Sequence, residues 1–87
     1  MATTRQYSHE ELSAIWFKAQ IVPGYDPNMY RKDSYGRWIE WRAYGQTTKF
    51  GWEVDHVIPL ARNGPHNLNN WRPLHWENNR CKGDRLI

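Results

Sequence analysis

Four polar residues in the second half of the chain have the types and the spacing that suit phosphodiester hydrolysis. Asp55 and His56 are adjacent at the end of an apolar segment, Asn70 lies 14 residues after His56, and Asn79 lies 9 residues after Asn70. Carboxylate and amide oxygens are hard donors that suit Mg²⁺ or Mn²⁺, and an imidazole that titrates near neutrality activates water. One divalent ion beside an imidazole therefore supplies the base and the charge stabilisation that this hydrolysis needs.

The segments around these residues have to form elements that bring them together. The pattern indicates, in order, a strand (52–59), a loop rich in Gly, Asn and Pro (61–69), a short strand (71–74) and a helix (76–82). The first strand carries Asp55 and His56 at its end. Pro73 places the second strand at a sheet edge, and Gly83 ends the helix. A strand folded back on a strand, with a helix across both, lets Asp55 and Asn79 face one point.

The first half of the chain is predicted to be scaffold. Ser8 and Glu11 have the capping-box spacing that starts a helix, and apolar residues recur at helical spacing until Pro23-Gly24 ends the pattern. A turn at 34–36 then precedes a short strand at 38–41. The arginines and aromatic residues around this turn and strand also suit a nucleic-acid surface. We interpret the rings as part of the core of a small domain.

The composition indicates one folded domain with unevenly placed charge. The chain has 87 residues, of which 15% are aromatic, so its core should depend on a few large rings. The net charge is +3, and the whole excess lies in residues 56–87, where five Lys/Arg face two Asp/Glu. Such a basic end favours a polyanionic partner. No apolar run approaches the roughly 18 residues of a membrane helix, so no membrane partner is expected. The first 15 residues carry His9, Glu10 and Glu11 and no apolar stretch, so no secretory signal is expected.

Cysteine usage bears on location and on metal chemistry. Cys81 is the one cysteine of the chain, so an internal disulfide and a multi-cysteine zinc cage are excluded. We therefore expect a reducing, cytoplasmic location.

Three segments resemble a known family. Asp55-His56-Val57-Ile58-Pro59, Asn70-Trp71-Arg72-Pro73-Leu74-His75 and Asn79-Arg80-Cys81-Lys82-Gly83-Asp84, in this order and at this spacing, resemble the HNH endonucleases of the ββα-metal (His-Me finger) class. The resemblance covers residues 51–84, and the stretch 25–36 is similar to small stand-alone bacterial and phage HNH proteins. It implies an α+β fold in which an N-terminal helix and β-hairpin pack on a C-terminal ββα-metal unit. We accordingly expect one HNH nuclease domain over residues 1–87, with a scaffold at 1–50 and the ββα-metal motif at 51–87.

The resemblance also implies roles for individual residues. His56 matches the general base that activates water, and Asp55 matches the metal-binding acid before it. Asn70 matches the central asparagine, which holds the loop around the active site in shape. Asn79 stands where the last histidine of the motif gives the family its name, and it would be the second metal ligand. Asparagine takes this place in the HNH domain of RNA-guided CRISPR effectors as well.

The implied nucleic-acid contacts come from basic residues on and near the last helix. Arg80 and Lys82 would lie against the phosphate backbone of DNA. Arg72 and Arg62 are further candidates, although a solvated basic face accounts for them equally well. Backbone contacts position DNA without reading its bases, so we expect weak sequence preference.

Two departures from the family pattern concern the metal. Many HNH proteins hold a structural zinc with two CxxC pairs, which this sequence lacks, so no structural zinc is expected. Asn79 is a neutral ligand, so one Mg²⁺ or Mn²⁺ would be held loosely and required at millimolar concentration.

Three positions leave alternatives open. His75 is an accessory metal ligand, a phosphate contact or a packed core histidine. Asn78 replaces Asn79 as the ligand if the register of the helix slips by one residue. His66 lies in the Gly-Pro loop and is expected to be solvated.

The function we expect is metal-dependent cleavage of DNA that leaves 5′-phosphate and 3′-OH ends. The alternative is a module that kept the HNH fold to bind DNA or a protein but lost turnover. The presence of Asp55, His56 and Asn79 together argues against that alternative. A small toxin or effector with an immunity partner would use the same chemistry on a particular target.

Overall fold

The structure is a computed structural model that describes residues 6–86. Its helices and strands, in chain order, are α1 (His9–Trp16), β1 (Tyr30–Lys32), β2 (Trp38–Glu40), β3 (Trp52–His56), β4 (Trp71–His75) and α2 (Trp76–Lys82). Short 3₁₀ turns lie at Trp41–Ala43, Leu60–Arg62 and Leu68–Asn70. The strands form two antiparallel hairpins, β1–β2 and β3–β4. The predicted α+β class, with two helices and two small hairpins, is confirmed.

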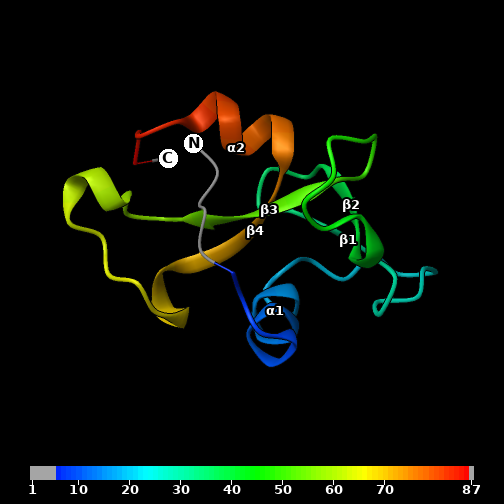
Figure 1. The fold of residues 1–87 in the computed structure, drawn as a ribbon. Helices are drawn as coiled ribbons and strands as arrows, with labels where there is room; N and C mark the ends of the chain where they lie inside the picture. Colours follow the sequence, from blue (N-terminus) through cyan, green and yellow to red (C-terminus); the bar gives the residue numbers. More distant parts are fainter. Residues whose placement is uncertain (1–5, 87) are drawn as a thin grey trace.

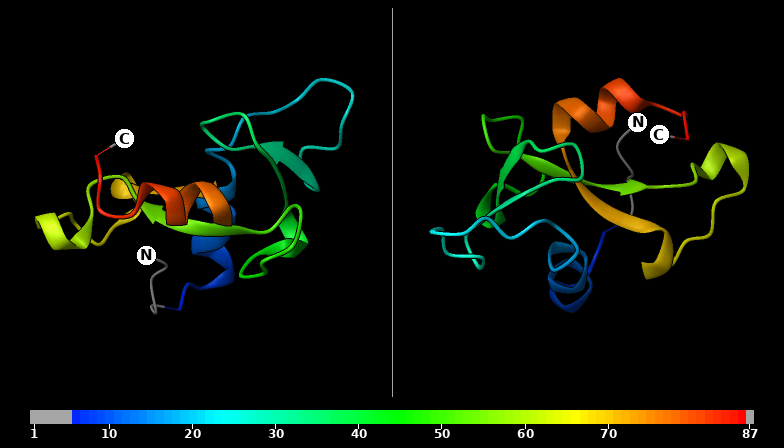
Figure 2. Two further views of the ribbon diagram at one scale, coloured as in Figure 1. Left: turned by 90° about the horizontal axis from the view of Figure 1, so that it is seen from above. Right: turned by 180° about the vertical axis from the view of Figure 1, so that it is seen from behind.

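The β3–β4 hairpin is the central layer of the fold, with α1 on one side and α2 on the other (Figure 1). The views from above and from behind show the same arrangement (Figure 2). In the register of this hairpin, Trp52 pairs with His75 and His56 pairs with Trp71. Every residue of β3 is buried because both faces of the strand are covered. The β1–β2 hairpin lies near the start of β3, and the loop 57–70 joins its end to β4 (Figure 1).

The first helix begins as its capping residues predict. The hydroxyl of Ser8 accepts from the backbone N–H of Glu11 at 3.0 Å, and the carboxylate of Glu11 accepts from the backbone N–H of Ser8 at 2.9 Å. The helix ends at Trp16, earlier than the apolar pattern suggests. It ends there because the next residues turn toward β1, where Gln20 pairs with Lys32.

The core depends on large rings, as the composition predicts. Trp16, Trp52 and Trp71 are buried together with aliphatic residues from α1 and β2. The rings of Trp16 and Trp52 lie 5.3 Å apart between centroids. The interpretation of the hairpin rings as core is wrong for Tyr30 and Trp38, which lie outside this cluster.

A buried carboxylate fastens the β1–β2 hairpin to the start of α2. Asp33 is fully buried. Its Oδ1 accepts from the backbone N–H groups of Tyr35 and Arg37, at 3.0 and 2.9 Å. Its Oδ2 accepts from the backbone N–H of His75 at 3.0 Å and from the side-chain amide of Asn78 at 2.8 Å. These four hydrogen bonds offset the cost of burying the charge.

Candidate active site

The two faces of β3 hold different parts of the candidate site. Side chains alternate along a strand, so Glu53 and Asp55 share one face while His56 lies on the other. The face with Glu53 and Asp55 meets α2, where Asn79 and Lys82 lie one helical turn apart. Glu53 bonds to Asn79 at 2.9 Å, and Asp55 pairs with Lys82 at 3.2 Å.

Asp55 is a buried carboxylate that already binds two cations of the chain. The Nε of Arg72 lies 2.8 Å from its Oδ2, and the ammonium of Lys82 lies 3.2 Å from its Oδ1. Lys82 also donates to the backbone carbonyl of His56 at 3.1 Å. Asp55 and Lys82 are 4% and 2% exposed, so this ion pair is shielded from solvent. Both carboxylate oxygens of Asp55 are therefore engaged by cations of the chain itself, which a metal ion would have to displace.

Asn79 is buried on the same inner face, with its amide turned to a different acid. Its Nδ2 donates to Glu53 Oε1 at 2.9 Å, and Arg80 holds the other oxygen of Glu53 at 3.1 Å. Among the residues that the structure describes, no hydrogen bond joins Asp55 and Asn79 directly. Asn78 points elsewhere, to Asp33. The register therefore turns Asn79, and not its neighbour, toward β3.

His56 lies on the opposite face, with its ring nitrogen in contact with two other rings. Its Nε2 accepts from the indole N–H of Trp71 at 3.2 Å and lies 2.9 Å from Nδ1 of His66. The rings of the two histidines stack at 5.0 Å. Because an indole N–H only donates, Nε2 of His56 holds a lone pair. A neutral imidazole of this kind is the form that a general base needs.

His66 is a site residue that the sequence did not reveal. It was expected to be solvated, and it is indeed exposed, but its ring also covers His56. Nothing in its loop position indicates this contact, because the loop places it through tertiary structure. Glu53 was missed as well, although the period-2 pattern of a strand puts it on the face of Asp55.

Asn70 binds the backbone of the loop that begins after β3. Its Oδ1 accepts from the N–H of Ile58 at 2.8 Å, and its Nδ2 donates to the carbonyls of Ile58 and Pro65 at 2.9 and 2.8 Å. Gly64 lies close by, where an added Cβ would fall 1.7 Å from the carbonyl oxygen of Ile58. The loop is thus closed tightly around one buried side chain.

His75 sits at the other end of the hairpin, away from His56. It is fully buried, its Nδ1 accepts from the backbone N–H of Glu77 at 3.1 Å, and its Nε2 lies 2.8 Å from the carbonyl oxygen of Lys49. Both ring nitrogens are therefore engaged within the chain. Of the alternatives for His75, this geometry favours the packed histidine, which here also caps α2, over the metal ligand.

The basic residues predicted to contact DNA fall into two groups. Lys82 was expected to lie against the backbone, but it is buried beneath α2 because Asp55 holds it, and this correction gives it a place inside the site. Arg72 likewise points to Asp55. Arg62 and Arg80 remain on the surface, where Arg62 donates to the carbonyl of Asp84 at 3.0 Å and Arg80 is half-exposed.

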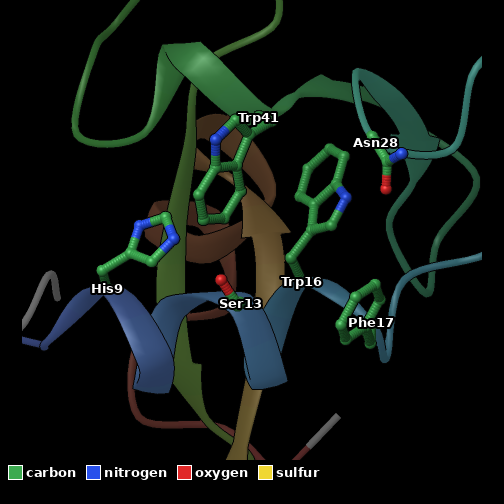
Figure 3. Close-up of a pocket in the computed structure, with 6 residues that line it drawn as sticks. All are labelled: His9, Ser13, Trp16, Phe17, Asn28 and Trp41. Carbon is green, nitrogen blue, oxygen red and sulfur yellow. The ribbon is translucent and has the colours of Figure 1, made fainter.

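A hollow of about 190 Å³ between α1 and the turn Trp41–Ala43 is not part of this site (Figure 3). The residues that line it are His9, Ser13, Trp16, Phe17, Asn28 and Trp41. It adjoins α1, whereas the carboxylates of β3 face α2.

The oxygen donors on the α2 face of β3 suit a hard divalent cation. Asp55 and Glu53 offer carboxylates, and Asn79 offers an amide oxygen. The ammonium of Lys82 lies between the carboxylate of Asp55 and the backbone carbonyl of His56. Within residues 6–86 there is no group of three or more His, Cys, Asp and Glu able to hold a metal ion.

Comparison with known proteins agrees with this geometry. Residues 45–85 match the HNH endonuclease family, a class that generally uses a divalent metal ion and acts on DNA. The match includes β3, the loop, β4 and α2, and it confirms that this part of the chain belongs to the HNH endonuclease family. It indicates a nuclease-type function. No curated protein and no solved structure matches the chain.

None of the helices in residues 6–86 is long and apolar enough to cross a bilayer.

Proposed function

We propose that this protein is a metal-dependent DNA endonuclease whose active site lies at the end of β3. One observation carries the proposal: a buried carboxylate that holds cations, Asp55, is followed directly by an imidazole with a lone pair on Nε2, His56. The family match over residues 45–85 supports it. We further propose that residues 1–87 act as one domain, because α1 packs against β4.

His56 takes a proton from the attacking water. The Nδ1 of His66 lies 2.9 Å from Nε2 of His56, which is the distance at which a general base meets its water. The water therefore takes the position of His66, whose loop has to yield when DNA binds. Asn70 keeps the rest of that loop fixed through its three backbone hydrogen bonds.

Asp55 and Asn79 would hold one Mg²⁺ or Mn²⁺, with Glu53 orienting the amide of Asn79. When bound, such an ion stabilises the negative charge on the phosphate and on the leaving 3′-oxygen. In-line attack by the deprotonated water forms the new P–O bond and breaks the P–O3′ bond, which leaves a 5′-phosphate, and a solvent water protonates the departing oxygen to give the 3′-OH. Lys82 has to leave Asp55 or share it, because its ammonium lies where the ion belongs.

Surface arginines are the proposed contacts to the DNA backbone. Arg80 and Arg62 lie on the same side as α2 and its C-terminal turn, and both keep exposed guanidinium groups. Contacts of this kind do not read bases. We therefore expect weak sequence preference and strong dependence of binding on salt.

Plasmid cleavage tests the proposal. The intact protein is incubated with supercoiled DNA in Mg²⁺, in Mn²⁺ or in EDTA, beside His56→Ala and a matched control, His9→Ala, in an exposed histidine of α1. Nicking that requires metal, disappears in His56→Ala and persists in His9→Ala would support the nuclease and its base together. Cleavage that persists in His56→Ala would refute the role of that residue.

A catalytically silent HNH-fold module is the second candidate. It is favoured by the closed state of the site, in which Arg72 and Lys82 occupy Asp55 and His66 covers His56. The absence of cleavage in any metal, at high protein and low salt, together with retention of DNA, would favour this candidate.

A further inference from the structure

A pocket lined by aromatic rings lies on the β1–β2 hairpin, outside the residues that form the candidate active site. Its volume is about 420 Å³, within the range of small-ligand sites. Its lining residues are Tyr25, Tyr30, Trp38 and Phe50. Each comes from a different segment: the turn after α1, β1, β2 and the connection before β3. We call this group the aromatic pocket.

The rings of the aromatic pocket are not part of the hydrophobic core. None of them belongs to the buried cluster or is packed against it. Tyr25 is 54% exposed, and its ring lies 4.7 Å from that of Trp38. The rings of Tyr30 and Phe50 lie 6.3 Å apart at 80°. Tyr30, Trp38 and Phe50 are only partly buried, and apolar rings left partly open around a hollow are typical of a binding surface.

Positive charge borders the aromatic pocket. The ammonium of Lys32 lies 5.1 Å from the centre of the Trp38 ring, and that of Lys49 lies 5.6 Å from the centre of Phe50. The acid nearby is Glu40, which hydrogen-bonds the hydroxyl of Tyr30 and holds the pKa of that phenol above its usual 10.0. Rings for stacking, with ammonium groups beside them, complement a base and its phosphates.

The same hairpin connects the aromatic pocket to the candidate active site. Tyr35 lies in the turn between β1 and β2. Its hydroxyl accepts a hydrogen bond at 3.3 Å from the guanidinium of Arg72, which pairs with Asp55. Trp38 lies three residues after Tyr35, so the Cα atoms of these two residues are at most about 11 Å apart. The hairpin that carries the aromatic pocket is therefore in contact, through Tyr35, with a residue of the candidate active site.

We propose that the aromatic pocket binds an unstacked nucleobase of single-stranded DNA that flanks the cleaved phosphate. The base stacks on Trp38 and Tyr25, while Lys32 and Lys49 contact its phosphates. This inference rests on the proposed function for its placement, but it concerns binding and requires no turnover.

Binding in EDTA tests the inference apart from cleavage. Fluorescence anisotropy measures the affinity of the full chain for a labelled 12-nucleotide single strand, with Trp38→Ala and Tyr25→Ala as variants. The matched control is Phe17→Ala, in an exposed aromatic outside the pocket. We expect Trp38→Ala to weaken binding by about 5- to 150-fold, the range of one lost base stack. Trp38→Phe should recover most of the affinity that Trp38→Ala loses. The affinity for a duplex of the same sequence should differ little between the intact protein and these variants.

The two proposals fail in different ways. Equal single-strand binding by the intact protein, Trp38→Ala and Tyr25→Ala would overturn the proposal that the aromatic pocket binds a nucleobase. Equal weakening by Trp38→Ala and Phe17→Ala would also overturn it. If the intact protein cleaves no plasmid but its strand binding depends on Trp38, the pocket stands and the nuclease falls. If Trp38→Ala unfolds in a thermal melt, Tyr25→Ala decides, because its ring is the more exposed.

Discussion

Replacement of Lys82 by methionine should make the protein bind divalent ions more tightly. In the structure the ammonium of Lys82 lies 3.2 Å from Oδ1 of Asp55 and 3.1 Å from the carbonyl oxygen of His56, and it is almost fully buried. An ion that uses Asp55 has to displace this ammonium. Methionine keeps the length of the apolar stem and removes the competing charge.

The size of the effect follows from the geometry. Two unit charges 3.2 Å apart attract by about 5 kcal/mol at an effective dielectric constant of about 20. Hydration of the displaced ammonium compensates most of this attraction. The net free energy of displacing Lys82 from Asp55 therefore resembles that of losing a hydrogen bond to a charged group, about 1.5–3 kcal/mol. Since 1.4 kcal/mol is a factor of ten, we expect Lys82→Met to bind Mn²⁺ about 10- to 100-fold more tightly.

The assay is a titration with Mn²⁺ followed by electron paramagnetic resonance, without DNA. The control is Arg85→Met, which removes the same charge from an exposed residue of the same end of the chain. Arg72 still pairs with Asp55 in Lys82→Met, so the fold should persist, and Mn²⁺ should raise its melting temperature more than that of the intact protein. Mn²⁺ binding by folded Lys82→Met that is no tighter than in Arg85→Met would refute the reasoning.

Three further outcomes test other parts of the structure. Asn70→Ala should lower the free energy of unfolding by about 2–4 kcal/mol in urea denaturation, because it leaves the backbone of Ile58 without partners in a closed loop; a loss below about 0.5 kcal/mol would contradict this. Asp33→Asn should cost about 3 kcal/mol in the same assay, because an amide N–H₂ faces donors where the carboxylate accepts four hydrogen bonds; an unchanged midpoint would count against it. Arg37→Ala should raise the pKa of Glu77 toward 4.5 in an NMR titration, since the hydrogen bond and charge of Arg37 lower it. Any stability from that pair is present above pH 4.5 and is lost as the pH falls through the lowered pKa.

Local patterns in the sequence were enough to place most of the elements. Ser8 and Glu11 form their capping box, and α2 ends before Gly83. The strands β3 and β4 begin where their alternation indicates, but β3 ends at His56 and not at Pro59, because the loop held by Asn70 begins there. Such signals are local, because a cap or a strand depends on residues a few positions away. The helix α1 ends at Trp16, well before Pro23-Gly24, and the chain after it pairs with β1 at Gln20, a long-range contact that no local pattern indicates.

The site could be predicted only in part, for a physical reason. The residue types and spacing of Asp55, His56 and Asn79 suggest the proposed chemistry, because two oxygen donors for a divalent ion and an imidazole are suited to phosphodiester hydrolysis. The residue types and their spacing do not indicate which charged side chains form ion pairs with one another. Lys82 was expected on the surface, and tertiary packing buried it against Asp55.

The sequence by itself determined the α+β elements and the HNH motif, and it indicated a nuclease-type function, because these depend on side-chain chemistry and on short-range periodicity. The tertiary structure decided the partners: Lys82 and Arg72 on Asp55, His66 on His56, and open aromatic rings on the hairpin instead of in the core. These contacts join residues 10 to 27 positions apart. Their geometry is fixed by how the helices and hairpins pack, which no local pattern specifies.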